Sequence, residues 1–403
     1  MRKSILVLVM SGEMKCFFRG LDRTANRLGG SLLLCFLIIL CRIGVSQAMF
    51  LSPGDAKSAP RGRVGCRPCS RIGIRFLNPE RLGPHGYSYA WSEKNGIVYA
   101  CRAGFLDIAH VRGAIDRTAF LATKTFHKLQ KQETEFSFKL AEPSLYFVKL
   151  VPPDNWNYLP QKEKEDIARD ISIRLGQYFA HTACIWHEIL TWFGYKSVGF
   201  FPEFHSAFSC EDTFSDLIGS HIGAMALQDT EHEFDQAAAL ALDRELKKLG
   251  AQTRRTAIRA TKMVSGQWFS GGLLFVQTKR RNFDIGLEDG SVTPWIVPAV
   301  SGFRVTEAQS YPAPNSDFLS EYGFSLKFEL EPREWEKDKI MKIVYPDARE
   351  RRRRIEPIIH FTQIMDYIKK DAVRRYGYYA GSPSQETVAE DATDAAALAL
   401  FPN

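Results

Sequence analysis

The stretch from His181 to His221 gathers the residue types that could do chemistry. It contains four histidines, two tryptophans and several carboxylates, spread over two helical patterns and the loop between them. Such polar groups are costly to bury among large apolar residues unless they are paired or bind a metal ion. We therefore expect either a metal site or a buried ion-pair network to be centred on this stretch.

His187-Glu188 is the first candidate for a metal site, because this pair begins the motif of helical metalloproteases. That motif needs a second histidine four residues after the first, and Thr191 stands at that position. The zincin motif is therefore excluded, and further ligands must come from other segments. Asp107 and His110 lie three residues apart, so both would project from one face of a helix. We predict a site for a divalent metal, with zinc as the expected ion and Asp107, His110 and His187 as its ligands.

Carboxylates near these ligands indicate hydrolysis as the reaction. Glu188 and Glu211 are the expected catalytic residues, because a carboxylate base beside an open metal position can activate water. No P-loop, GxGxxG or GxSxG motif lies in a strand–turn–helix context, so neither a nucleotide cofactor nor a hydrolase serine is expected. The sequence thus favours a metal-dependent hydrolase.

A buried ion-pair network is the alternative interpretation. Arg112, Asp116 and Arg117 could join Asp107 in a salt-bridge network that ties its helix to its neighbours, with Asp212 as a further member of this polar cluster. Such networks perturb pKa values without any catalytic role. On this interpretation the chain is a non-catalytic structural or interaction protein of the cell envelope. Cys101 opens a third possibility, a nucleophilic thiol near a helix N-terminus.

Helical patterns account for the middle of the chain. Apolar spacing predicts helices over 105–129, 162–193 and 230–249. Gly194 is the expected C-cap of the second of these helices. Another helix is expected after Ser209, because its spacing to Asp212 is that of a capping box. This helix carries a run of small residues over 219–224, which permits close contact with a second helix.

Strand patterns precede and follow these helices. They predict strands over 97–101, 135–140, 145–150, 273–278, 282–285, 293–297 and 324–330. The expected fold class is α+β, with a mainly helical core, a smaller C-terminal β-rich section and a closing helix over 357–376. We expect one globular domain over 96–380, an irregular Gly- and Pro-rich arm over 49–95 before it, and a disordered tail over 381–403.

The N-terminus has the three parts of a secretory signal peptide, which we place over 1–48. Basic residues precede an apolar run over 32–41, and small residues over 46–48 offer a cleavage site. This run is too short to span a bilayer, which needs roughly 20 apolar residues. We expect an exported protein, periplasmic or associated with the cell envelope, without a transmembrane span after cleavage. An uncleaved anchor is the alternative, and either Met1 or Met14 is the start.

The net charge argues against a nucleic-acid partner. Residues 1–48 carry seven Lys and Arg against two carboxylates, so they contribute +5 of the formal +7 and leave +2 for the rest. An envelope substrate or protein partner is expected instead. Cys66 and Cys69 have the spacing of a CxxC motif, but no strand–helix unit surrounds them, so we expect a structural thiol pair.

Several longer strings carry a resemblance to a known family. These are NGIVY at 95–99, GFLDIAHVR at 104–112, HE with TWFG at 187–194, SAFS with ED at 206–212, RNFDIG at 281–286 and PWIVP at 294–298. With them the chain resembles a family of exported bacterial proteins, the domain of unknown function 4056, over most of 66–376. The resemblance implies export and a single domain, and it implies no particular activity.

Overall fold

The computed structural model describes residues 50–376 except 53, 67, 69–74, 198–200, 203, 272–275, 298–299 and 301–306. The expected signal peptide over 1–48 and the expected tail over 381–403 lie outside the described residues, and so does Cys69. The chain divides into two units, Met1–Ala48 and Met49–Asn403, and every described residue belongs to the second.

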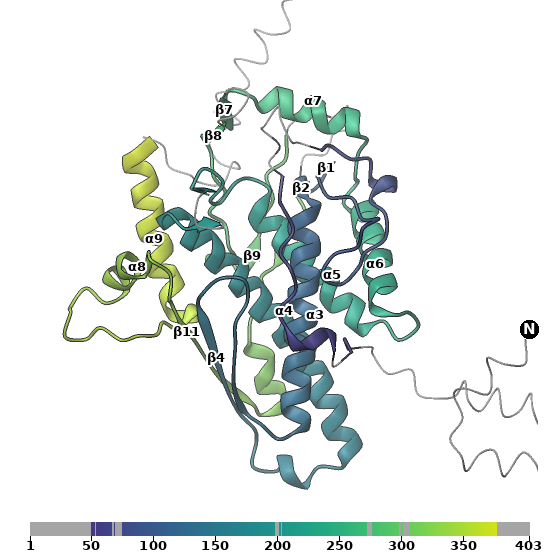
Figure 1. Cartoon of the computed structure of the whole chain (residues 1–403), viewed down its shortest axis with the longest axis vertical. Helices are drawn as coiled ribbons and strands as arrows, with labels where there is room; N and C mark the ends of the chain where they lie inside the picture. The colour runs from purple at the N-terminus through teal and green to yellow at the C-terminus, as the bar shows by residue number, and fades with distance from the viewer. Residues whose placement is uncertain are drawn as a thin grey trace, which may run out of the picture. The chain divides into compact units, whose positions relative to one another are not determined.

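Three helices form the centre of this unit (Figure 1). They are α3 (Ile108–Gln130), α4 (Gln161–Phe193) and α5 (Asp212–Gln228). The predicted helices over 105–129 and 162–193 are thereby confirmed, and α4 ends where Gly194 takes the left-handed conformation with φ of 106°. α5 begins at Asp212 itself, so the predicted capping box is wrong. Ser209 instead donates a hydrogen bond to the Asp212 carboxylate, over 2.6 Å.

Glycines allow these helices to approach closely. A Cβ at Gly219 would lie 2.2 Å from the Val111 carbonyl oxygen, and one at Gly176 would lie 2.6 Å from Ala122. A Cβ at Gly223 would lie 2.9 Å from the Ile115 carbonyl oxygen, four residues further along both helices, so α5 runs parallel to α3. The predicted role of the small residues over 219–224 is thus confirmed. The N-termini of α3 and α5 consequently lie together, beside the C-terminal half of the antiparallel α4.

Shorter helices surround this core. They are α6 (Phe234–Lys248), α7 (Arg254–Val264), α8 (Lys337–Val344) and α9 (Pro357–Tyr376), with 3₁₀ turns at Asp55–Lys57, Pro79–Arg81, Trp156–Tyr158 and Asp317–Tyr322. α9 confirms the predicted closing helix, whereas the sequence patterns did not predict α8. Among the described residues, no helix has both the length and the apolar character needed to cross a membrane.

The largest sheet joins segments that are far apart in the sequence. Its antiparallel strands are β3 (Glu135–Phe138), β4 (Leu145–Val151) and β11 (Ser325–Glu331), in the order β11-β4-β3. The ring of Phe328 lies 4.6 Å from that of Phe179, so the sheet packs against α4. Since its central strand comes from 145–151, the C-terminal section does not build this sheet by itself.

Other strands form short antiparallel pairs. These are β1 (Ile97–Ala100) with β2 (Gly104–Asp107), β5 (Lys196–Ser197) with β6 (Phe201–Pro202), β7 (Phe269–Gly271) with β8 (Val276–Thr278), and β9 (Ser291–Val292) with β10 (Tyr311–Pro312). The predicted strands over 282–285 and 293–297 are wrong, because none of their residues lies in a strand. β2 also includes residues 105–107, which the apolar pattern assigned to the helix predicted over 105–129. Asp107 therefore ends a strand and begins α3.

Candidate functional site: a buried acidic cluster

Asp107 occupies the junction between β2 and α3. It is fully buried, and its Oδ1 accepts a hydrogen bond from the Ala109 backbone over 2.9 Å, which caps the helix. Its Oδ2 accepts a hydrogen bond from the Cys66 backbone over 2.7 Å, and its own N–H donates to Ser215 Oγ over 3.0 Å. Burial raises the pKa of Asp107 to about 6. This carboxylate thus joins the arm, α3 and α5.

His110 connects Asp107 to the first turn of α5. Its Nδ1 lies 2.8 Å from Asp212 Oδ1 and 3.7 Å from Asp107 Oδ2. Although burial opposes it, the charges of Asp212 and Asp107 raise the pKa of His110 well above its usual value. The His110 side chain is 30% exposed, against 3% and 0% for the two carboxylates. Of these three side chains, the His110 imidazole is therefore the one that is partly exposed to solvent.

The arm closes over this imidazole. A Cβ at Gly65 would lie 2.9 Å from His110 Nε2 and 2.8 Å from Asp107 Oδ2. These distances are shorter than normal van der Waals contacts, so the backbone at Gly65 can take its place only because it has no side chain. The segment of Gly65 and Cys66 thus covers the solvent side of the cluster.

Glu188 and Glu211, the expected catalytic residues, lie in the same region. Burial and the negative charge of Asp212 raise the pKa of each to about 8. Glu188 Oε2 accepts a hydrogen bond from the Phe208 backbone over 2.5 Å, and Glu211 Oε2 accepts one from the Cys210 thiol over 3.2 Å. Both carboxylates are buried, so they favour the protonated form at neutral pH.

Asp216 extends the cluster by one turn along α5. Burial raises its pKa, and its Oδ1 accepts no hydrogen bond from any described residue. Arg117 is one of the positive groups that act on it, and this guanidinium donates to the Cys184 Sγ over 3.0 Å. Asp216 follows Asp212 by four residues, so both carboxylates lie on the same face of α5.

His187, an expected metal ligand, lies beside the cluster and not within it. Its Nδ1 is 2.9 Å from Glu142 Oε1. Although burial opposes it, the hydrogen bond from His187 helps to lower the pKa of Glu142 to about 2. Glu142 lies in the connection between β3 and β4, and the sequence patterns gave no signal for it. His187 still acts on Glu188 and Asp216 through its charge.

His181 and His221 do not join the cluster. Burial and the nearby His221 lower the pKa of His181 to about 3, so its ring is neutral. His221 Nε2 lies 3.0 Å from the Pro312 carbonyl oxygen, on another side of α5. Of His181, His221 and the carboxylates of this stretch, it is Asp212 that lies against His110, over 2.8 Å.

A comparison with known families covers the residues of this cluster. The model of the family described as Protein of unknown function (DUF4056) matches residues 80–275. Residues 80–275 are a DUF4056 domain. The resemblance drawn from the sequence is confirmed for this range, which contains α3, α4, α5 and all the clustered side chains named above. No curated protein and no solved structure is significantly similar to the chain.

A second buried network joins the DUF4056 domain to the arm. Arg112 donates to Glu93 Oε2 over 2.9 Å, and Arg63 donates to Glu93 Oε1 over 2.7 Å and to Asp116 Oδ2 over 2.5 Å. His85 Nε2 lies 2.9 Å from Asp116 Oδ1. Arg112 and Asp116 thus tie α3 to the arm as members of an ion-pair network. Their partners lie before β1, in a segment without periodicity.

The donor set of the acidic cluster suits proton transfer or a hard cation. Among the residues that the structure describes, no three His, Cys, Asp or Glu side chains form a group that could hold a metal ion. Oδ1 of Asp216 and Oε1 of Glu211 are nevertheless buried without a hydrogen-bond partner among the described residues. Such oxygens need either a proton or a cation, because a bare buried carboxylate is costly.

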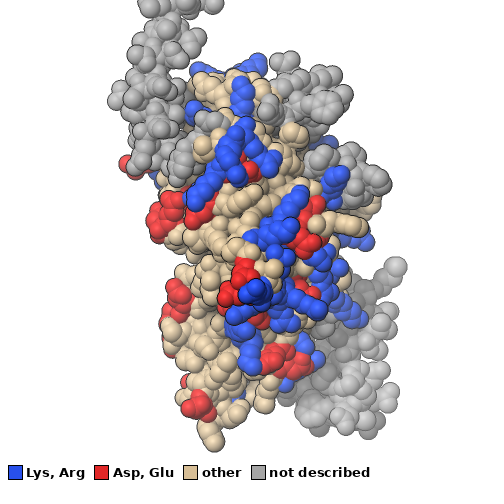
Figure 2. Space-filling model, turned by 90° about the vertical axis from the view of Figure 1, so that its left-hand side faces the viewer, with Lys and Arg blue, Asp and Glu red and all other residues tan. Residues whose placement is uncertain are grey.

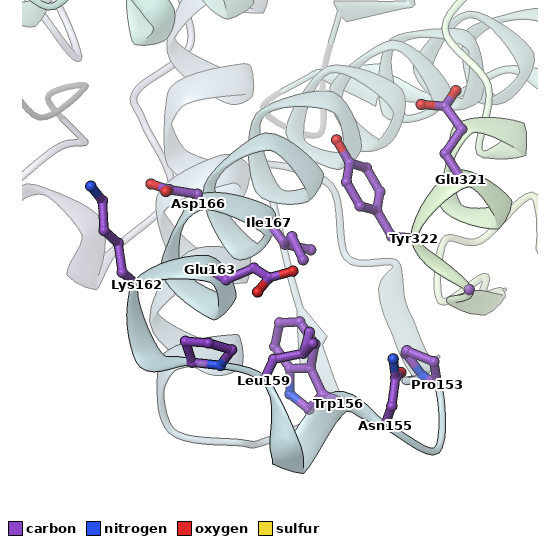
Figure 3. A pocket seen from close by; sticks show the side chains of 12 residues that line it. Pro153, Asn155, Trp156, Leu159, Lys162, Glu163, Asp166, Ile167, Glu321 and Tyr322 are labelled. Carbon is purple, nitrogen blue, oxygen red and sulfur yellow. The ribbon is translucent and has the colours of Figure 1, made fainter.

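The largest of three surface hollows lies away from this cluster. It has a volume of about 850 Å³ and is lined by residues at the start of α4 and around Tyr322 (Figure 3). Trp156, Leu159 and Ile167 form its apolar part, and Glu163 lies beside them. None of the residues that line the three hollows belongs to the acidic cluster.

Proposed function

We propose that the DUF4056 domain is a metal-dependent hydrolase whose site is the acidic cluster. One observation carries this proposal, namely the surplus of buried carboxylates over positive groups. Five carboxylates share the region, and His110 contacts two of them directly, Asp107 and Asp212; the five are Asp107, Glu188, Glu211, Asp212 and Asp216. A divalent cation would balance this surplus and would give the unpartnered oxygens a ligand.

The geometry favours particular roles for these residues. Asp107, His110 and Asp212 would hold the cation: His110 Nδ1 lies 2.8 Å from Asp212 and 3.7 Å from Asp107, and the three would have to draw closer, because no described residues form a metal-binding group of three as they stand. A bound zinc ion supplies a Lewis acid and lowers the pKa of a bound water to about 7. Glu188 would accept the proton of that water, since a nearby positive charge lowers its raised pKa. Glu211 would serve as the second acid–base group. The positive charge of His187, which lies beside the cluster, would stabilise the negative charge of Glu188.

The place of action we propose is outside the cytoplasm. The support is the basic, apolar and small-residue pattern over 1–48, which is typical of a secretory signal peptide. Fusion of these residues to an alkaline phosphatase reporter tests this part, because that reporter is active only after export. An inactive fusion would contradict export without affecting the proposed reaction.

Metal content and hydrolysis can be measured separately on the full chain. After incubation with zinc and dialysis, we expect about one equivalent of bound zinc by elemental analysis. His110→Ala should lose the metal, whereas Glu188→Gln should keep it and lose hydrolysis of chromogenic ester, phosphoester or peptide substrates. His232→Ala is the matched control, because His232 also pairs with an aspartate, over 3.0 Å, and its side chain is also 30% exposed.

Two results would decide against the proposal. One is a chain that binds no zinc above the His110→Ala variant. The other is a zinc content that all three variants share, which would place the metal elsewhere. A Glu188→Gln variant that keeps both metal and full activity would remove Glu188 from the reaction but leave the metal site in place.

A non-catalytic function is the second candidate, and the arm network favours it. Arg112, Glu93 and Asp116 are buried, and with Arg63 they form ion pairs that tie the arm to α3. In this arm network, buried charged groups stabilise the fold without binding a ligand. If the acidic cluster is of the same kind, the chain is a structural or interaction protein of the envelope. In that case His110→Ala and Glu188→Gln lower the free energy of unfolding, and neither zinc nor substrate changes it.

A further inference from the structure

Large apolar side chains are exposed around α8 and the start of α9. Trp335, just before α8, is 99% exposed, and Ile358 and Ile359, in the first turn of α9, are 64% and 59% exposed. Single exposed apolar residues are common on protein surfaces. These three are unusual because they flank a run of arginines in the same part of the chain, outside the residues that the family model matches.

That run spans 349–354 and contains five arginines and one glutamate. Arg354 has a structural role, because it pairs with Glu329 over 3.1 Å and stacks 3.4 Å above the ring of Phe147. The other four are exposed and form no ion pair with any described residue: Arg349, Arg351, Arg352 and Arg353. Their charge is therefore available to a partner.

Backbone pairing fixes the position of the run. Leu330 and Ile355 exchange two hydrogen bonds, of 2.8 and 2.9 Å, which hold the end of the run against β11. Trp335 follows Leu330 by five residues and Ile358 follows Ile355 by three, so the apolar side chains remain close to the arginines. Figure 2 shows the face that carries α8 and α9, where Lys and Arg gather in a broad band with fewer carboxylates between them.

We propose that this face binds the surface of an anionic lipid bilayer. The negative surface charge of an anionic leaflet attracts arginines, and exposed Trp and Ile side chains enter the boundary between headgroups and acyl chains. A nucleic acid would use the arginines alone, since its backbone offers nothing to Ile358 and Ile359. The combination of unpaired arginines with apolar side chains therefore favours the bilayer. This inference does not depend on the proposed hydrolase activity.

Co-sedimentation with vesicles tests this inference on the full chain. Vesicles of phosphatidylglycerol and phosphatidylcholine are compared with vesicles of phosphatidylcholine alone. Replacing Arg351, Arg352 and Arg353 with Gln should weaken partition onto the anionic vesicles at least about tenfold, and added salt should weaken the unchanged chain similarly. Replacing Ile358 and Ile359 with Ser should also weaken it, without changing the dependence on salt.

Matched control variants remove the same kinds of side chain from other surfaces of the protein. Arg254, Arg255 and Arg259 are exposed on α7, so their replacement with Gln removes the same charge from another surface. Leu240→Ser removes an exposed apolar side chain from α6. Every variant carries the same residues 1–48, whose contribution to lipid binding therefore cancels.

Three outcomes would overturn the inference. The full chain could fail to prefer anionic vesicles, or the α7 variant could lose as much binding as the variant of the run. Finally, the isoleucine variant could bind anionic vesicles with the same affinity as the unchanged chain. That result would indicate that the face recognises negative charge alone and does not insert into a bilayer. All the replaced side chains are exposed, so the unfolding transition of each variant should match that of the unchanged chain.

Discussion

His110 Nδ1 lies 2.8 Å from Asp212 Oδ1, and this pair joins the first turn of α3 to the first turn of α5. The two residues are about a hundred positions apart in the sequence. Both helices direct their N-terminal backbone N–H groups toward the same region, which favours carboxylates there. The pair therefore marks the centre of the acidic cluster, and the charge balance of that cluster can be tested in several ways.

The free energy of unfolding should fall as the pH rises from about 5 to 8. Glu188 and Glu211 have folded pKa values of about 8 against an ordinary value of 4.5, so folding favours their protonated forms. Their stabilisation is complete below pH 4.5 and is lost as the pH rises through 8. Urea unfolding at several pH values measures this slope. Glu188→Gln should reduce it, and Glu163→Gln, at an exposed position of α4, should not. An unchanged slope in Glu188→Gln would contradict the prediction.

Glu142 should give the opposite dependence in acid. Its folded pKa is lowered to about 2 although burial opposes this, chiefly because His187 donates a hydrogen bond to it. The stabilisation is present above pH 4.5 and is lost as the pH falls through 2. Glu142→Gln should therefore remove on the order of 3 kcal/mol at neutral pH and flatten the loss of stability in acid. Equal acid denaturation of both chains would show that the Glu142–His187 pair does not stabilise the fold.

A methyl group at Gly219 should separate α5 from α3. Its Cβ would lie 2.2 Å from the Val111 carbonyl oxygen, so the helices must move apart or bend. We expect Gly219→Ala to lower the free energy of unfolding by about 1–3 kcal/mol, as overpacking does. Gly113→Ala on α3 is the control, because nothing lies within 4 Å of its Cβ. That variant should be stabilised by up to about 1 kcal/mol through helix propensity. Similar Tm values for the two variants would rule out close packing at Gly219.

Removal of Arg112 should loosen the arm. Without it, Glu93 keeps Arg63 but loses a buried hydrogen bond of 2.9 Å, the Pro84 carbonyl loses the Arg112 donor, and the Leu82 carbonyl keeps the Lys94 N–H alone. We expect Arg112→Ala to cost about 3–5 kcal/mol and to speed proteolysis within 50–95. Lys247→Ala breaks an exposed ion pair on α6 and should cost at most about 1 kcal/mol. If both variants unfold at the same urea concentration, the arm network does not stabilise the fold.

Much of the helical core could be predicted because its signals are local. Apolar residues at helical spacing identified α3, α4 and α9, and the small residues over 219–224 identified a close helix contact. Short strands could not be predicted in this way, because a run of two or three residues has no period. Thus 282–285 and 293–297 had strand-like composition, but in the structure they lie outside any strand.

The sequence by itself singled out Asp107, His110, Glu188 and Glu211 as candidate site residues, since they are polar within apolar patterns. Only the tertiary structure decided their partners. It pairs His110 with Asp212, His187 with Glu142, and Arg112 with Glu93 of the arm. The reason is physical: helical spacing fixes the face on which a side chain lies, whereas packing between distant segments decides what that face meets.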